Sequence, residues 1–381
     1  KLAEYLKDIP MRKNEWDQRH VPYELSNAEH LAMSDSVGMI NLSHFPIMDI
    51  EGPDAEQMLE YLSVAKIGDN TPIGKVIYTN FLDEDGGVHA DLTISRLAEN
   101  KYRIVTGGAD GNRDWVLLRN YRDDNSLDVN INIRTHDIAT LGLWGPGAEA
   151  ALGNFVDPSA INLENFPFVT AKNLTLNLSE GKAIDVWAAR ISYVGESGWE
   201  IYLNNNSEEG LALYDSLLKI GVVPVGIETY ANSRRLEKSF RLQGADLETE
   251  YNACEAAIQR PLVKEADFHG KAAHLIQRDE EPCSILCTMT VDDLNVSGET
   301  RYPVGISPII DLKTGEVPVD SKGRRSYTTG MSYCPSIKEF VVMGYLPMEL
   351  AKEGQKLAIE YFNEDGDGLY PITVKIVGKG S

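Results

Sequence analysis

The stretch from Lys75 to Thr106 constrains the fold most, because three segments rich in β-branched and aromatic residues follow one another with short connections. The residues between them, 83–87 (DEDGG) and 98–100 (AEN), are typical of turns. We therefore expect three antiparallel strands, at Lys75 to Leu82, Val88 to Arg96 and Lys101 to Thr106.

The rest of the chain mixes helix and strand patterns up to about residue 280. Gly38 to Ile50 alternates as one strand would, Asn112 to Arg122 and Gly147 to Gly153 have helical spacing, and Val129 to Leu143 is rich in strand formers. Residues 281–381 show short strands separated by Gly, Pro and Asp, which is typical of a small β-barrel or sandwich. A chain of 381 residues is too long for one ordinary core, and the best domain boundary is the acidic stretch 278–282 (RDEEP).

Charge and hydropathy exclude several classes of function. The chain has 36 basic and 58 acidic residues, a net charge of -22, whereas a nucleic-acid-binding protein needs a basic face. There is no run of about 18 apolar residues that could span a membrane, and the first residues lack the apolar centre of a signal peptide. We expect a cytoplasmic protein that binds neither nucleic acid nor membranes.

Residues that could hold a metal or a dinucleotide are sparse. Cys283 and Cys287 form one C-x3-C pair in a strand-like segment with no second pair, so we interpret them as buried and structural. The histidines form no pair at helical spacing, and neither a phosphate-binding loop nor a G-x-G-x-x-G fingerprint occurs. The sequence predicts neither a metal site nor a flavin site.

The most informative segment is 191–202 (ISYVGESGWEIY), where Gly195 and Gly198 interrupt two strand-like runs. Glu200 begins the second run. Two interpretations stay open from the residues alone. Glu200 is a solvated carboxylate at a strand end, or it accepts the paired N–H groups of a heterocycle such as a pterin.

Residues 193–200 (YVGESGWE) resemble the Y-T/V-G-E-x-G-F/W-E signature of the folate-binding aminomethyltransferase family, the glycine cleavage T-protein family. Asn41, where the family usually has Asp, begins another matching block. The matching blocks agree in order: 41–45 (NLSHF), 86–93 (GGVHADLT), 233–241 (SRRLEKSFR) with 255–256 (EA) and 267–271 (DFHGK), and 343–347 (MGYLP). The resemblance implies an α+β, aminomethyltransferase-like multi-domain fold. Its folate-binding region would span 1–280 as two intertwined α+β subdomains, with a C-terminal β-barrel over 281–381.

The resemblance also implies tetrahydrofolate as cofactor and methyl acceptor, and it assigns residues to the site. Asp91 matches the family's carboxylate near the reacting nitrogens of the folate, in a catalytic or a folate-orienting role. Glu200 matches the carboxylate that binds the pterin ring. Arg235 matches an arginine near the folate, and Tyr102 follows the hairpin that carries Asp91 and would line the same pocket.

Local details indicate which branch of the family is involved. Val194, Trp199 and Ala90 replace the Thr, Phe and first Asp that are commoner in glycine-cleavage enzymes, and the matched blocks resemble the folate domains of dimethylglycine and sarcosine dehydrogenases. Those enzymes also carry a flavin domain, whose fingerprint this chain lacks. A member of this branch without a flavin domain would transfer a methyl group without redox chemistry. The whole sequence also resembles the family members that demethylate the sulfonium dimethylsulfoniopropionate. That resemblance implies methyl transfer to N5 of tetrahydrofolate, giving 3-methylthiopropionate and 5-methyltetrahydrofolate.

A sulfonium favours aromatic faces, and Tyr193, Trp187 and Trp199 lie on or beside the signature segment. Core packing is the alternative for each of the three. No arginine stands out as the partner of the substrate carboxylate. Two other functions stay open, namely aminomethyl transfer in glycine cleavage and a non-catalytic folate-binding accessory role. The expected partners are small molecules, and a homodimer stays open.

Overall fold

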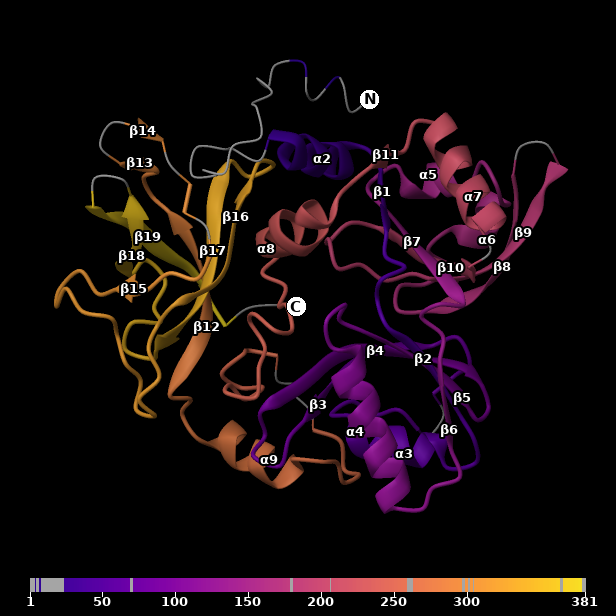
Figure 1. Cartoon of the computed structure of the whole chain (residues 1–381), viewed down its shortest axis with the longest axis horizontal. Coiled ribbons are helices and arrows are strands. Elements are labelled where there is room, and N and C mark those ends of the chain that lie inside the picture. Colours follow the sequence, from indigo (N-terminus) through magenta and orange to yellow (C-terminus); the bar gives the residue numbers. More distant parts are fainter. Residues whose placement is uncertain are drawn as a thin grey trace. The chain divides into compact units, whose positions relative to one another are not determined.

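Two compact units make up the chain, which we describe from a computed structural model (Figure 1). The structure describes Glu4, Lys7 and residues 24–378, except 69–70, 179–180, 206, 259–262, 297–298, 301, 304 and 364–365. Unit 1 consists mainly of Ala32–Val225 and Pro261–Ala273, and unit 2 of Leu2–Leu31, Gly226–Arg260 and His274–Ser381. The domain boundary near residue 280 stays a prediction.

The first sheet of unit 1 contains the three strands that the sequence predicts, and their antiparallel pairing is confirmed. The turn between the first two is fixed by Gly86, at φ 80°, and by Asp83, whose Oδ1 accepts from the Gly87 N–H at 2.7 Å. The strand order is β3 (Val76–Leu82), β4 (Val88–Ala98), β5 (Lys101–Thr106), β2 (Ile47–Glu51) and β6 (Asn130–Ile133). Helices α3 (Ala55–Leu62) and α4 (Gly111–Asp124) bury apolar side chains on one face of this sheet.

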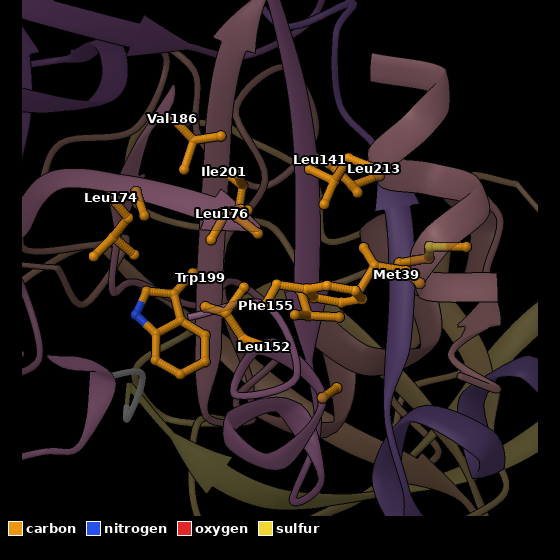
Figure 2. Close-up of a cluster of buried hydrophobic side chains, with 14 of the residues drawn as sticks. Met39, Leu141, Leu152, Phe155, Leu174, Leu176, Val186, Trp199, Ile201 and Leu213 are labelled. Atoms are coloured by element: carbon orange, nitrogen blue, oxygen red, sulfur yellow. The ribbon is translucent and has the colours of Figure 1, made fainter. Parts of the chain in front are cut away.

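The second sheet of unit 1 carries the signature segment. Its order is β11 (Val223–Pro224), β1 (Gly38–Asn41), β7 (Ile138–Trp144), β10 (Gly198–Asn204), β9 (Ala183–Ala189) and β8 (Ala171–Asn177). Helices α5 (Ala148–Leu152), α6 (Pro158–Ile161) and α7 (Ser207–Lys219) cover its outer face, where Leu152, Leu213 and Trp199 share one hydrophobic core (Figure 2). The expectation of one strand over Gly38 to Ile50 is wrong, because the chain turns at residues 42–45, where the Phe45 N–H donates to the Leu42 carbonyl, and passes from one sheet to the other.

The inner faces of the two sheets pack against each other. Ile47 and Val76 of the first sheet share a buried apolar cluster with Ala189 and Tyr202 of the second. Unit 1 is therefore built of four layers in the order helices, sheet, sheet, helices. Side chains that point inward from either sheet face the opposite sheet.

Unit 2 holds one large sheet. Its order is β15 (Ile309–Ile310), β18 (Lys356–Asn363), β19 (Gly366–Val377), β12 (Ser284–Val291), β17 (Glu339–Pro347) and β16 (Thr328–Cys334). The edges β15 and β16 meet through a bridge between Pro308 and Tyr327, so the sheet curls into the barrel-like form that the sequence predicts. Elsewhere in the chain lie α2 (Glu24–Asp35), the π-helix η3 (Thr229–Arg234), α8 (Arg235–Glu237), α9 (Lys271–Asp279), β13 (Asn295–Val296) and β14 (Glu299–Thr300).

The α+β class is thus confirmed. No helix among the residues described is both long enough and apolar enough to cross a membrane.

Candidate functional site

Asp91 projects from the inner face of β4. Alternation along the strand places Ala90 and Leu92 in the core beneath α3 and α4, so Asp91 points the opposite way. Register places Asn80 of β3 directly across from Asp91. The Asn80 side-chain amide donates to Asp91 Oδ1 at 2.7 Å, and the Tyr78 hydroxyl, two residues earlier on the same face, is also hydrogen-bonded to Asp91. The carboxylate is therefore held in a defined orientation.

The Tyr78 ring is accessible although its hydroxyl is held by polar neighbours. The residue is 40% exposed. Burial of the hydroxyl, followed by the negative charge of Asp91, raises the pKa of Tyr78 well above its usual value, and Tyr193 contributes in the same direction. Tyr78 therefore stays protonated and donates to Asp91, while its ring offers a surface to a ligand. Tyr193, in the loop after β9, lies near enough to influence that hydroxyl.

Glu200 projects from the inner face of β10. Its neighbours Trp199 and Ile201 enter the outer core, so Glu200 and Tyr202 share the face that turns toward the first sheet. Glu200 is 9% exposed, and burial raises its pKa to about 7, against the opposing effect of the Tyr202 hydroxyl. That hydroxyl donates to Glu200 Oε2.

The second oxygen of Glu200 fits the demand of a pterin. Among the residues that the structure describes, none donates a hydrogen bond to Oε1. A buried carboxylate with one oxygen already oriented and the other available can accept N–H groups from a flat heterocycle. This hydrogen-bond acceptor is therefore compatible with tetrahydrofolate, whose ring carries such N–H groups.

Both carboxylates lie on facing surfaces. Tyr78 and Asn80 share a strand face with Val76, and Glu200 shares one with Tyr202. Since Val76 and Tyr202 meet in the inner apolar cluster, Asp91 and Glu200 project from sheets that are packed face to face. Asp91, Glu200 and Trp187 therefore lie on the inner faces of the two sheets of unit 1, and Tyr193 lies near the Tyr78 hydroxyl.

Trp187 is engaged on two sides. Its ring lies 5.1 Å from the Tyr202 ring, centroid to centroid, and the Arg103 guanidinium carbon lies 5.3 Å from its centroid. The cation beside this ring is therefore already a protein side chain. A role for Trp187 toward the substrate stays a prediction, and its observed contacts are those of a spacer between the two sheets.

Two predicted residues lie on the opposite faces of their strands. Trp199 is fully buried in the outer core (Figure 2), where the Arg190 guanidinium carbon lies 4.9 Å from its ring. Tyr102 is fully buried with the core beneath α3, and its hydroxyl donates to Glu56 at 2.8 Å. Alternation therefore turns both side chains away from the inner face that carries Asp91 and Glu200.

Arg235 belongs to unit 2. It is 1% exposed and its guanidinium forms an ion pair with Asp246, while its Nε donates to the Ala231 carbonyl at 2.7 Å. Asp246 also accepts from Thr329. Within its own unit Arg235 thus ties the end of η3 to a loop and to β16. Its role toward folate stays a prediction.

Residues suited to metal binding do not cluster in the part of the chain that the structure describes. Cys283 and Cys287 are free thiols. Only Cys287 has the burial expected for both, since Cys283 is partly exposed.

Sequence reasoning missed four residues that shape the site. Tyr78 and Asn80 orient Asp91, Tyr202 orients Glu200, and Arg103 contacts Trp187. A signal existed for Tyr202, because it lies two residues after Glu200 in a strand and must share its face. The contacts of Tyr78, Asn80 and Arg103 depend on strand register and sheet packing, which the local pattern does not specify.

The chain is similar to known proteins over most of its length. The family described as GCVT N-terminal domain matches residues 9–265. Mitochondrial dimethylglycine dehydrogenase of Rattus norvegicus is 30% identical over 359 residues, covering 91% of this chain, and that of Homo sapiens is 29% identical over 363 residues, covering 92%. The chain spans only 38% of the length of these relatives.

A solved structure supports the same fold. The glycine cleavage system aminomethyltransferase T from Bartonella henselae superposes with a TM-score of 0.74 at 24% identity, covering 92% of this chain and 88% of that one. The fold is that of an aminomethyltransferase-like protein. The chain belongs to the GCVT family, whose members bind tetrahydrofolate.

Proposed function

We propose that this protein is a dimethylsulfoniopropionate demethylase. It transfers one S-methyl group of dimethylsulfoniopropionate to N5 of tetrahydrofolate. The carbon–sulfur bond breaks, a carbon–nitrogen bond forms and the N5 proton is lost to solvent. The products are 3-methylthiopropionate and 5-methyltetrahydrofolate. The names of the relatives point to a dimethylated amine, and a dimethylsulfonium is its sulfur counterpart with a permanent positive charge.

The observation that carries the proposal is the Asp91 carboxylate, fixed by two donors beside the accessible ring of Tyr78. A sulfonium methyl group already has a neutral thioether as leaving group, so the reaction requires neither a covalent nucleophile nor a strong base. The protein must align sulfur, methyl carbon and nitrogen, and orientation of this kind can contribute about 7–11 kcal/mol at best.

Asp91 has a specific electrostatic role in this reaction. Positive charge moves from sulfur to nitrogen as the methyl group is transferred. A carboxylate held in advance near the nitrogen stabilises that developing charge without reorganising. Because Asn80 and the protonated Tyr78 both orient Asp91, its lone pairs are directed before the substrates bind.

Aromatic faces would receive the sulfonium. Of the three aromatic residues proposed from the sequence, Trp199 is packed in the outer core and Trp187 already faces Arg103. Tyr193 therefore has the strongest support, together with the Tyr78 ring. Cation–π contacts of this type contribute about 0.5–2 kcal/mol each, which also favours an onium donor over a neutral amine.

The test is an anaerobic assay with tetrahydrofolate and dimethylsulfoniopropionate, with both products identified by mass spectrometry. We expect methylthiopropionate and 5-methyltetrahydrofolate in equal amounts. A chain that binds folate but forms neither product overturns the donor assignment.

Two further assays separate the alternatives. Formation of methylenetetrahydrofolate from a lipoyl-bound aminomethyl group would identify a glycine-cleavage aminomethyltransferase. Folate binding without turnover of any sulfonium, methylamine or aminomethyl donor would identify an accessory protein.

A further inference from the structure

Arg103 occupies an unusual place for a charged side chain. Its neighbours Tyr102 and Ile104 on β5 enter the core beneath α3 and α4, so Arg103 points to the inner side, where it is 8% exposed. Its Nε and Nη2 donate to the two Asp49 oxygens at 2.8 and 3.0 Å. Burial of an ion pair between two sheets is expensive in desolvation, so a purely structural explanation is weak.

Asp49 is shared between two arginines. Arg134 donates to the same carboxylate at 3.2 Å from a more exposed position, and it also pairs with Asp137. Asp49 therefore does not serve Arg103 alone. The guanidinium of Arg103 retains positive character on the side that faces the Trp187 ring, at 5.3 Å from the ring centroid.

The contacts continue from Trp187 to Glu200. The Trp187 ring lies 5.1 Å from the Tyr202 ring at an angle of 55°, and the Tyr202 hydroxyl donates to Glu200 Oε2. Strand pairing places Trp187 directly across from Tyr202. A contiguous series of contacts thus runs from the Asp49–Arg103 pair on one sheet to the Glu200 carboxylate on the other.

We propose that Arg103 is a positioning residue for folate binding, which acts through Trp187 and Tyr202 to hold the Glu200 carboxylate in its binding orientation. This inference rests on the proposed role of Glu200 in binding the pterin. Arg103 holds the Trp187 indole ring in place, and that ring limits rotation of the Tyr202 ring. The Tyr202 hydroxyl then fixes Glu200 Oε2, so that Oε1 faces the ligand.

Loss of this support changes the charge state of Glu200 as well as its orientation. Two influences act on the Glu200 pKa, namely burial, which raises it, and the Tyr202 hydroxyl, which lowers it. If Tyr202 moves away, burial acts alone and the pKa rises further. A larger fraction of Glu200 is then protonated at neutral pH and cannot accept the N–H groups of the pterin.

The test compares Arg103→Met with Arg134→Met. Both changes remove a partner of Asp49, but only Arg103 contacts Trp187. The dissociation constant for tetrahydrofolate is measured by calorimetry between pH 6 and pH 9. We expect Arg103→Met to weaken binding about threefold to thirtyfold at pH 7, to shift the midpoint of the pH profile upward, and to regain much of the affinity at high pH. Arg134→Met leaves the midpoint in place.

Three outcomes overturn the inference, and one result separates it from the proposed function. The inference is wrong if Arg103→Met weakens folate binding equally at all pH values, or if it leaves folate binding unchanged. It is also wrong if Arg103→Met and Arg134→Met give the same dissociation constants and the same midpoint of the pH profile. If Arg103→Met does not fold, Trp187→Leu removes the intermediate ring and must give the same upward shift. Glu200→Gln is the reference. Unchanged folate affinity in Glu200→Gln refutes the proposed pterin site, whereas a loss there without a shift in Arg103→Met refutes the inference alone.

Discussion

At the scale of single residues, two carboxylates on facing surfaces have different environments. Asp91 is held by two neutral donors beside an accessible ring, whereas Glu200 is buried and has one phenol as its partner. The first arrangement suits a carboxylate that stabilises a nearby positive charge, and the second suits one that recognises a flat ring. Their roles should separate in kinetic and binding measurements.

Asp91→Asn should slow turnover much more than it weakens folate binding. The amide keeps the size of the side chain but removes the negative charge that opposes positive charge on nitrogen. We expect kcat to fall on the order of 100-fold, with the tetrahydrofolate dissociation constant changed by less than about threefold. Glu84→Gln, in the exposed turn of the same hairpin, is the matched control. Equal losses in kcat and affinity would indicate a folate-orienting role for Asp91.

Glu200→Gln should stabilise the protein at high pH but not at low pH. The folded-state pKa of Glu200 is raised from 4.5 to about 7 by burial, so ionising this side chain costs folding free energy. The cost is absent below about pH 4.5, grows through pH 7 and then levels off at about 3 kcal/mol. Urea unfolding of both proteins at pH 5 and pH 8 measures the difference. A constant difference between the two pH values would show that Glu200 does not titrate as described.

At the scale of strands and helices, alternation explains both what the sequence predicted and what it did not. The hairpin of β3 and β4 followed from its turn residues. The motif singled out Asp91, which the structure places on the inner face of β4, and its role stays a prediction. The sequence predicted Trp199 and Tyr102 in the site, but both face away from it. Trp199 precedes Glu200 in β10 and so must lie on the opposite face. Tyr102 points from β5 into the core beneath α3. A turn at residues 42–45 separates β1 from β2, yet the alternating pattern of 38–50 concealed the change of sheet. Asn80 pairs with Asp91 only because a register shift between Phe81 and Leu82 separates this pair from the turn. The local sequence does not encode that shift.

Gly198→Ala should damage the pairing of β10 with β7. Gly198 has φ 154°, and an added Cβ would lie 1.9 Å from the Leu143 carbonyl oxygen, so the strands would have to separate. We expect a loss of unfolding free energy on the order of 3 kcal/mol or more, measured by urea denaturation. Gly323→Ala is the control, because Gly323 has φ 84° with nothing within 4 Å, and its conformational strain alone should cost about 1 kcal/mol. Similar losses in the two variants would show that β10 and β7 accommodate the side chain.

At the scale of the whole molecule, the dominant property is charge. The net charge of -22 is spread over 381 residues, and mutual repulsion of this kind favours solubility while it opposes the compact state. Several ion pairs provide local attraction that opposes this repulsion. Arg103 with Asp49 and Arg235 with Asp246 are buried, and salt screens such pairs much less than exposed charges.

Thermal stability should therefore rise with ionic strength. Raising the KCl concentration from about 0.01 M to about 1 M shortens the screening length from roughly 30 Å to roughly 3 Å, which weakens the long-range repulsion. Exposed ion pairs lose little, because each contributes about 1 kcal/mol or less. We expect Tm at pH 8 to increase by several degrees, with a smaller increase at pH 5, nearer the pI of about 4.7. A Tm that falls with salt at pH 8, or equal slopes at the two pH values, would mean that specific ion pairs outweigh the net charge in this fold.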